Sequence, residues 1–263
     1  MLRLKYLTDR ERVPGPDHPH TLVSRSNLAD ALDYLGRHQE AADLHQQNLT
    51  DRERILGPDH PHTLGSRHNL ATALQSLGRY QEAADLHRQN LTDRESVHGP
   101  DHPDTLSSRN NLANTLYELG WHQEAIDLHR QNLTDRESVL GPDHPDTLSS
   151  RNNLATALQS LGWHQEAADP HRHNLTDRER VLGPDHPDTL VGSSLANTLY
   201  SLGRHQEAID LHQQTLTLRE RVLGPDHPHT LASRNNLARI GRQPPSGSVV
   251  RRLLNGFRGR SRG

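Results

Sequence analysis

The sequence predicts an all-α fold in which antiparallel helix pairs stack one after another into an α-solenoid. A 42-residue unit recurs along the 263 residues, and Leu and Ala recur within each unit at helical spacing. Only 31% of the residues are hydrophobic and 3% aromatic, which is too few bulky side chains for one large globular core. A solenoid needs only a thin apolar seam between neighbouring units.

The repeated unit is marked by the words Gly-Pro-Asp-His-Pro-(His/Asp)-Thr-Leu. These words begin at Gly15, Gly57, Gly99, Gly141, Gly183 and Gly224. They predict five full units and one partial unit over residues 15–241. Residues 1–14 match only the end of the unit's second helix, as a partial helix of a truncated unit. Residues 242–263 form a basic tail that we expect to be disordered.

The first helix of the unit, helix A, is predicted from about Pro19 to Leu35. Proline suits the first helical position because the N–H that it lacks would be unpaired there. Either Asp17 or His18 can cap this end, and Gly36 ends the helix. The apolar positions that share one face are Leu22, Leu28, Ala29, Leu32 and Leu35.

The second helix, helix B, is predicted from about His38 to Leu56, where Gly57-Pro58 ends it. Its inner side is expected to hold Ala41, Leu44, His45, Leu49 and Ile55. Two short helices joined by a glycine turn pack antiparallel, so each unit predicts one helical hairpin.

This unit resembles the tetratricopeptide repeat (TPR). Leu28-Ala29, Leu32 and Ala41 fall on signature positions of that family. The 42-residue length and the words Asn-Asn-Leu-Ala are similar to the kinesin light chain type, which in bacteria also follows nucleotide-binding domains of large regulatory proteins. The resemblance covers residues 1–241. Two sets of equivalent positions in the repeats depart from the tetratricopeptide pattern. Helix B has histidine at the aromatic positions 45, 87, 129, 171 and 212, and helix A has arginine at positions 25, 67, 109, 151 and 234.

The resemblance implies a right-handed superhelix whose concave side is lined by helix A. It then places a partner-binding groove at Asn27, Asn69, Asn111, Asn153, Asn236, Asn114, Asn197, Tyr117 and Tyr200. A carboxamide both donates and accepts, so it can hold the backbone of an extended peptide.

The arginines of helix A allow two interpretations. They can pair with neighbouring carboxylates such as Asp51 or Glu53, because a semi-buried arginine needs a partner. If they face the groove instead, they form a clamp for an acidic peptide. We favour the pairing.

No catalytic, metal or cofactor site is predicted. The chain has no Cys, and nearly every His, Asp and Glu is a copy within the repeat, whereas a catalytic residue should be unique. The pairs His18/His20, His60/His62 and His227/His229 offer only two ligands per loop, and zinc needs three or four. The Asn-Leu-Thr triplets at Asn48, Asn90, Asn132 and Asn174 lie inside predicted helices, so we do not expect glycosylation.

Two irregularities fall close together. Pro170 replaces the leucine of helix B, and an interior proline costs about 3 kcal/mol and kinks a helix. The next helix A lacks one residue, and it also lacks its arginine and the Asn before Leu195. We expect a weak seam between about residues 168 and 195, which is either a hinge or a sign of relaxed selection.

The sequence therefore predicts a non-catalytic, cytoplasmic protein-interaction scaffold, since it lacks an apolar leader or membrane segment. Its uncapped ends predict self-association. One alternative is a detached repeat region of a nucleotide-binding regulatory protein. Another is nucleic-acid contact through the six arginines of residues 242–263, which we do not favour.

Overall fold

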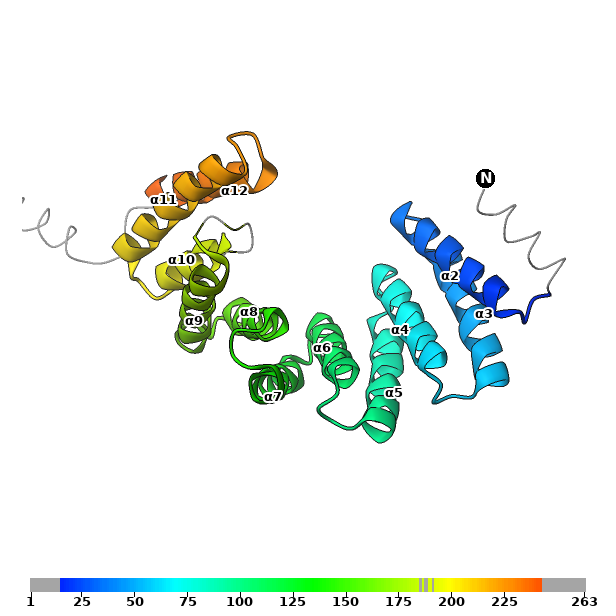
Figure 1. The fold of residues 1–263 in the computed structure, drawn as a ribbon. Coiled ribbons are helices and arrows are strands. Elements are labelled where there is room, and N and C mark those ends of the chain that lie inside the picture. The colour runs from blue at the N-terminus through cyan, green and yellow to red at the C-terminus, as the bar shows by residue number, and fades with distance from the viewer. Residues whose placement is uncertain (1–14, 185, 187–188, 191, 243–263) are drawn as a thin grey trace, which may run out of the picture. The chain divides into compact units, whose positions relative to one another are not determined.

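The computed structural model describes residues 15–184, 186, 189–190 and 192–242, and these form eleven helices (Figure 1). The A helices are α2 (Pro19–Tyr34), α4 (Pro61–Ser76), α6 (Pro103–Glu118), α8 (Pro145–Ser160), α10 (Gly192–Ser201) and α12 (Pro228–Arg242). The B helices are α3 (His38–Leu56), α5 (Tyr80–His98), α7 (His122–Leu140), α9 (His164–Leu182) and α11 (His205–Val222). The predicted all-α stack of helix pairs is confirmed, and the predicted ends of the first pair agree to within one residue.

The chain divides into two compact units, Met1–Ser150 and Arg151–Gly263, with the boundary inside α8. In the first unit each helix packs on the next, from α2 through α7. In the second unit α9, α10, α11 and α12 pack in the same sequential way. Each unit is therefore a run of helical hairpins in which a helix contacts mainly its chain neighbours. None of the described helices is long and apolar enough to cross a membrane.

The loop before each helix A explains the recurring Gly-Pro-Asp-His-Pro word. Gly15 has a φ of +97°, a conformation that side chains other than glycine's rarely adopt. His18, not Asp17, caps α2, because its Nδ1 accepts the His20 N–H at 3.2 Å. Thr21 closes the loop by donating from Oγ1 to the Gly15 carbonyl at 2.8 Å. The same histidine cap begins α4, α6 and α8.

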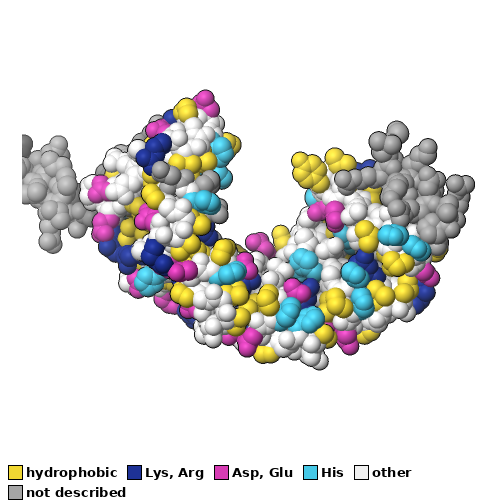
Figure 2. Space-filling model, in the orientation of Figure 1, with side chains coloured by type: hydrophobic (Ala, Val, Ile, Leu, Met, Phe, Trp, Pro, Cys, Tyr) yellow, Lys and Arg dark blue, Asp and Glu magenta, His cyan; other side chains and the backbone are white. Residues whose placement is uncertain are grey.

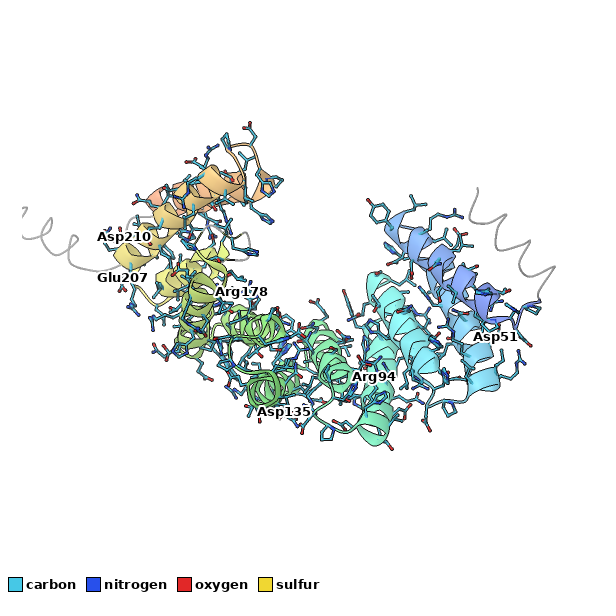
Figure 3. All side chains as sticks on the ribbon, in the orientation of Figure 1. Asp51, Arg94, Asp135, Arg178, Glu207 and Asp210 are labelled. Carbon is cyan, nitrogen blue, oxygen red and sulfur yellow. The ribbon has the colours of Figure 1, made fainter. Side chains whose placement is uncertain are left out.

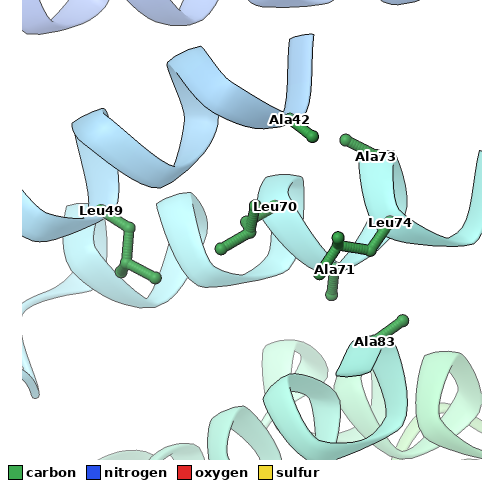
Figure 4. Close-up of a cluster of buried hydrophobic side chains, with 7 residues drawn as sticks. All are labelled: Ala42, Leu49, Leu70, Ala71, Ala73, Leu74 and Ala83. Carbon is green, nitrogen blue, oxygen red and sulfur yellow. The ribbon is translucent and has the colours of Figure 1, made fainter. Parts of the chain in front are cut away.

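The apolar seam consists of leucines and alanines from three successive helices (Figure 4). In the first unit, Ala42 and Leu49 of α3 meet Leu70 and Leu74 of α4, and Ala83 of α5 closes the cluster. Small alanines let the helices approach closely, so modest side chains fill the space between them.

Two predicted core positions are wrong. Leu35 is 68% exposed, although the corresponding Leu77 and Leu119 pack on core clusters. Leu35 belongs to the first described pair, which has no described pair before it. Ile55 is 39% exposed because the last turn of α3 extends past the seam towards the loop.

The arginines of helix A pair with carboxylates, as we favoured. Arg67 Nη1 donates to Asp93 of its own hairpin at 2.5 Å, and its Nη2 donates to Glu53 of the preceding hairpin at 3.1 Å. Arg109 binds Asp135 and Glu95 in the same way. Arg25, Arg151 and Arg234 pair with Asp51, Asp177 and Glu220. Figure 3 labels two of the acids, Asp51 on α3 and Asp135 on α7.

A second arginine row, on helix B, was not predicted. Arg52 Nη1 donates to the His62 carbonyl at 3.1 Å and to Ser66 Oγ at 2.8 Å, so α3 is tied to the start of α4. Arg94, labelled in Figure 3, donates to the Asp104 carbonyl at 2.8 Å in the next hairpin. Arg219 repeats this contact with His229 and Ser233. Together with Arg136, these residues tie the helices α3, α5, α7 and α11 to the first turns of the A helices that follow them.

Pro170 and the shortened helix A that follows it differ in their effect on the structure. Helix α9 runs through Pro170 and keeps the 19-residue length of α3, α5 and α7, so the proline does not end it. Helix α10 begins only at Gly192 and has 10 residues, whereas the other complete A helices have 16. Part of the expected weak seam, residues 185, 187, 188 and 191, lies outside the described residues.

The missing arginine of α10 is matched by a missing acid. Gly192 stands three residues before Leu195, as Arg151 stands three before Leu154. On α11 the corresponding acid position is Leu218. A Cβ on Gly192 would lie 2.5 Å from Thr215 Oγ1, so the closely packed α11 leaves no room for a larger side chain. Both charges of this pair are therefore absent together, and neither is left buried alone.

The five histidines of helix B lie in the seam, with exposures of 0 to 3%. Burial lowers the pKa of each, to about 4 for His87, His129 and His171. His45 Nε2 lies 3.5 Å from Asp30, whose charge favours protonation, but burial outweighs it and the pKa of His45 is also lowered. These rings are therefore neutral in the folded chain at neutral pH.

We predict that replacing Arg67 by Met lowers the free energy of unfolding by about 3 kcal/mol, because it leaves Asp93 half-buried without its partner. Chemical denaturation followed by circular dichroism measures the change. The control is Arg79→Met, which removes an exposed arginine paired with Glu82 and should lower the stability far less, because solvent screens an exposed ion pair. Equal losses in the two variants would contradict the structural role of the buried pair.

We also predict a lower melting temperature at pH 5.5 than at pH 7.5. The folded pKa of the buried histidines lies below the unfolded value of about 6.5, so their stabilising contribution is present above that value and is lost as the pH falls below it. Each histidine with a folded pKa of about 4 should cost about 1 kcal/mol at pH 5.5.

Thermal melts at the two pH values test this pH dependence. His129→Leu should reduce the difference in melting temperature, whereas His62→Leu, at an exposed position in the first turn of α4, should have a smaller effect. A melting temperature that is the same at both pH values in the unaltered chain would refute the prediction.

Candidate functional site

The residues predicted to bind a partner in the first unit lie on the A helices. Asn27 of α2 is exposed, and Asn69 of α4 is half-buried. On α6, Asn111 is half-buried, Asn114 is exposed one turn later, and Tyr117 is half-buried. The repeat thus presents carboxamides at matching positions of α2, α4 and α6.

Side-chain contacts bring α4 and α6 together along this face. Gln75 Nε2 donates to Thr115 Oγ1 at 2.7 Å, and Asn111 Nδ2 lies 3.4 Å from His68 Nδ1. Burial and the charge of Arg94 lower the pKa of His68, so this ring is neutral near pH 7 and can accept from Asn111. Two adjacent A helices therefore form one continuous polar strip, which we call the helix A face.

The predicted residues of the second unit are half-buried on three A helices. Asn153 lies on α8, Asn197 and Tyr200 on α10, and Asn236 on α12. Tyr200 packs edge-on against His205, with ring centroids 4.6 Å apart. Tyr117 of the first unit packs on His122 at 5.0 Å, so both tyrosines rest on the first residue of the following helix B. That contact restricts each ring and leaves part of it exposed.

Sequence reasoning missed the contribution of His68 to this face. Its position holds serine in the first repeat and asparagine in the third, so it does not stand out as a repeated signal. The structure shows its ring 5.7 Å from that of His87 and beside Asn111. The variation at this position, next to the Asn that recurs in all units but that of α10, is the signal that could have pointed to it.

Two other classes of site receive no structural support in the described chain. The residues searched hold no group of three or more His, Cys, Asp or Glu side chains that could bind a metal ion. In the loops, His18 and His60 use Nδ1 to cap a helix, which occupies that nitrogen. The four asparagines of the Asn-Leu-Thr triplets are at most 1% exposed, so glycosylation of the folded chain is blocked.

The charges on the surface are mixed. On the face seen in Figure 2, acidic, basic and histidine side chains are interspersed with small apolar patches. Many of the exposed arginines bind a neighbouring acid three residues away, as Arg79 binds Glu82 and Arg204 binds Glu207. Such local ion pairs neutralise much of the surface charge. The predicted basic tail is 242–263. Arg242 is the last residue of α12, and residues 243–263 lie outside the described residues.

Comparison with protein families identifies the repeat. Models of the tetratricopeptide repeat match residues 5–53, 34–96 and 66–134, and a second tetratricopeptide model matches residues 147–188 and 193–229. Together these matches span most of the chain. A search of curated proteins found no match.

Solved structures show the same fold. A putative kinesin light chain protein from Podosopora anserina with nearly identical TPR-like repeats is 32% identical, with a TM-score of 0.70, and the match covers 78% of this chain and 97% of that one. BtubC (BKLC) from P. vanneervenii is 20% identical, with a TM-score of 0.63 and coverages of 94% and 93%. YrrB, a TPR protein with an unusual peptide-binding site, is 13% identical, with a TM-score of 0.51 and coverages of 87% and 97%.

The last two similarities concern the fold alone, whereas the first extends to the sequence of the repeats. Together with the 42-residue hairpins and the family matches, they lead to one conclusion. The chain belongs to the tetratricopeptide repeat family, and its repeats are of the kinesin light chain-like type.

Proposed function

We propose that this chain is a non-catalytic scaffold that binds an extended peptide or a partner helix along the helix A face. Tetratricopeptide folds are in general platforms for protein interaction, and the extended, repetitive surface of a stack of hairpins suits such a partner. The structural similarity to YrrB, a TPR protein with an unusual peptide-binding site, supports the same class of partner.

The observation that carries the proposal is the polar strip on α4 and α6. Asn69, Asn111 and Asn114 place amide donors and acceptors on it at helical spacing, next to the half-buried ring of Tyr117. A peptide backbone presents alternating N–H and carbonyl groups, which carboxamides can satisfy without reading the peptide sequence. The arginines of helix A bind acids within the fold, so we do not propose a clamp for acidic peptides.

The test begins with peptides selected from a displayed random library against the full chain. We predict that the double variant Asn69→Ala/Asn111→Ala raises the Kd of a selected peptide about tenfold or more, because each lost hydrogen bond contributes about 1 kcal/mol. Fluorescence anisotropy with the labelled peptide measures the change.

The control is the double variant Gln81→Ala/Gln123→Ala, which removes two exposed carboxamides from the helices α5 and α7. Those side chains bind only Asp85 and Asp127 on their own helices. Affinity that is lost equally in both double variants, or in neither, would overturn the assignment of the binding face.

A further inference from the structure

A side-chain contact between the two helices of a hairpin recurs in this chain. In the first hairpin, Asn48 of α3 donates from Nδ2 to Ser26 Oγ of α2 at 2.6 Å. In the fourth, Asn174 of α9 donates from Nδ2 to Asn152 Oδ1 of α8 at 3.4 Å. In both hairpins the asparagine of helix B therefore binds the polar side chain that stands 22 residues before it on helix A.

The second hairpin does not make this contact. His68 of α4 stands 22 residues before Asn90 of α5, but its Nδ1 lies 3.4 Å from Asn111 Nδ2 of the next hairpin. Asn90 is 1% exposed, and within the described chain neither its Oδ1 nor its Nδ2 has a hydrogen-bond partner. A buried amide in this state is destabilising, because it has lost its hydrogen bonds to water without replacing them.

The ring of His68 lies next to the part of α5 that carries Asn90. Its centroid is 5.7 Å from that of His87. His87 precedes Asn90 by three residues, so the two side chains share one face of α5. A change in the side-chain rotamer of His68 can therefore exchange its contact on α6 for the contact on α5 that the repeat pattern predicts.

The contact of His68 with Asn111 is one that a ligand can replace. Its length of 3.4 Å exceeds the value of about 3.0 Å that is typical of a protein hydrogen bond. It occupies an N–H group of Asn111, which we place in the peptide-binding face. If a peptide carbonyl takes that N–H, His68 loses its partner on α6. The neutral ring has one donor and one acceptor nitrogen, so it can bind the amide of Asn90 instead.

We propose that His68 is a positioning residue that couples the helix A face to the interior of the second hairpin. It holds Asn111 while the face is empty, and it turns inward to Asn90 when a bound peptide takes the Asn111 amide. Binding then gives Asn90 the partner that it lacks in the free chain, and this gain adds to the affinity. The inference rests on the proposed function, and it gives Asn90, which is buried behind the face, a part in the strength of binding.

A pair of binding measurements on the full chain tests the coupling, with the library-selected peptide as the probe. We expect Asn90→Leu to raise the Kd about fivefold, the effect of about one hydrogen bond, because His68 then loses its inward partner. In a chain that also carries His68→Asn, the same Asn90→Leu change should alter the Kd by less than about twofold. The asparagine introduced there should bind within its own hairpin, as Asn152 does, in both the free and the bound chain.

The matched control is Asn48→Leu, the same substitution in the first hairpin. Asn48 has Ser26 as a partner in the free chain, so the change should lower the melting temperature but alter the Kd by less than about twofold. Asn90→Leu removes no hydrogen bond of the described chain, and circular dichroism establishes that each variant is folded at the assay temperature.

Nuclear magnetic resonance follows the movement itself, with and without peptide. The ring signals of His68 are identified by their disappearance in His68→Asn. In the free chain we expect nuclear Overhauser contacts from this ring to the side-chain amide of Asn111. In Asn111→Ala, which removes the outward partner, and in the peptide complex, we expect contacts to the amide of Asn90. A ring that does not approach Asn90 under either condition would overturn the proposal.

The binding data separate this inference from the proposed function. If Asn69→Ala/Asn111→Ala weakens binding but Asn90→Leu does not, the binding face stands and the role of His68 is refuted. If the Asn69→Ala/Asn111→Ala variant binds as tightly as the unaltered chain, the binding face is refuted and the role of His68 with it.

Discussion

A buried arginine on helix A must have carboxylates around it, and much of the repeat is arranged to provide them. Taking an unpaired guanidinium out of water would cost several kcal/mol. Helix α3 meets this requirement for two hairpins at once, since Asp51 binds Arg25 of its own hairpin and Glu53 binds Arg67 of the next. Arg52, between the two acids, binds the first turn of α4. Three consecutive residues thus connect three neighbouring elements.

This constraint explains how a chain with so few bulky residues holds its helices together. The apolar seam is made of alanine and leucine, and the positions beside it are filled by arginine, histidine and asparagine that are almost fully buried. Helix α10, which has no arginine at this position, also leaves no buried charge without a partner. Where α10 has Gly192 in place of arginine, α11 has Leu218 in place of the acid, so the pair is absent as a whole.

Much of the fold could be predicted from the sequence because recurring residues mark the ends of the helices. Glycine, histidine and proline mark the start of each helix A, and the Leu-Gly words mark its end, so the ends of α2 and α3 were predictable. The exposure of Leu35 and Ile55 was not, because periodicity shows which residues share a face but not what covers it. The bond from Arg52 to the His62 carbonyl could not be predicted either, because it depends on where the first turn of the next helix lies. At the candidate site, the positions of Asn69 and Asn111 followed from the repeat, whereas the role of His68 required its three-dimensional neighbours.

We conclude that the buried arginine and its acids act as a unit that stabilises neighbouring hairpins. A double-mutant cycle with Arg109→Met, Asp135→Asn and the combined variant tests it most directly, by unfolding each protein in denaturant. The account predicts that the two changes are strongly non-additive, with a coupling free energy on the order of 2 kcal/mol. Losses that simply add, to within about 0.5 kcal/mol, would contradict it.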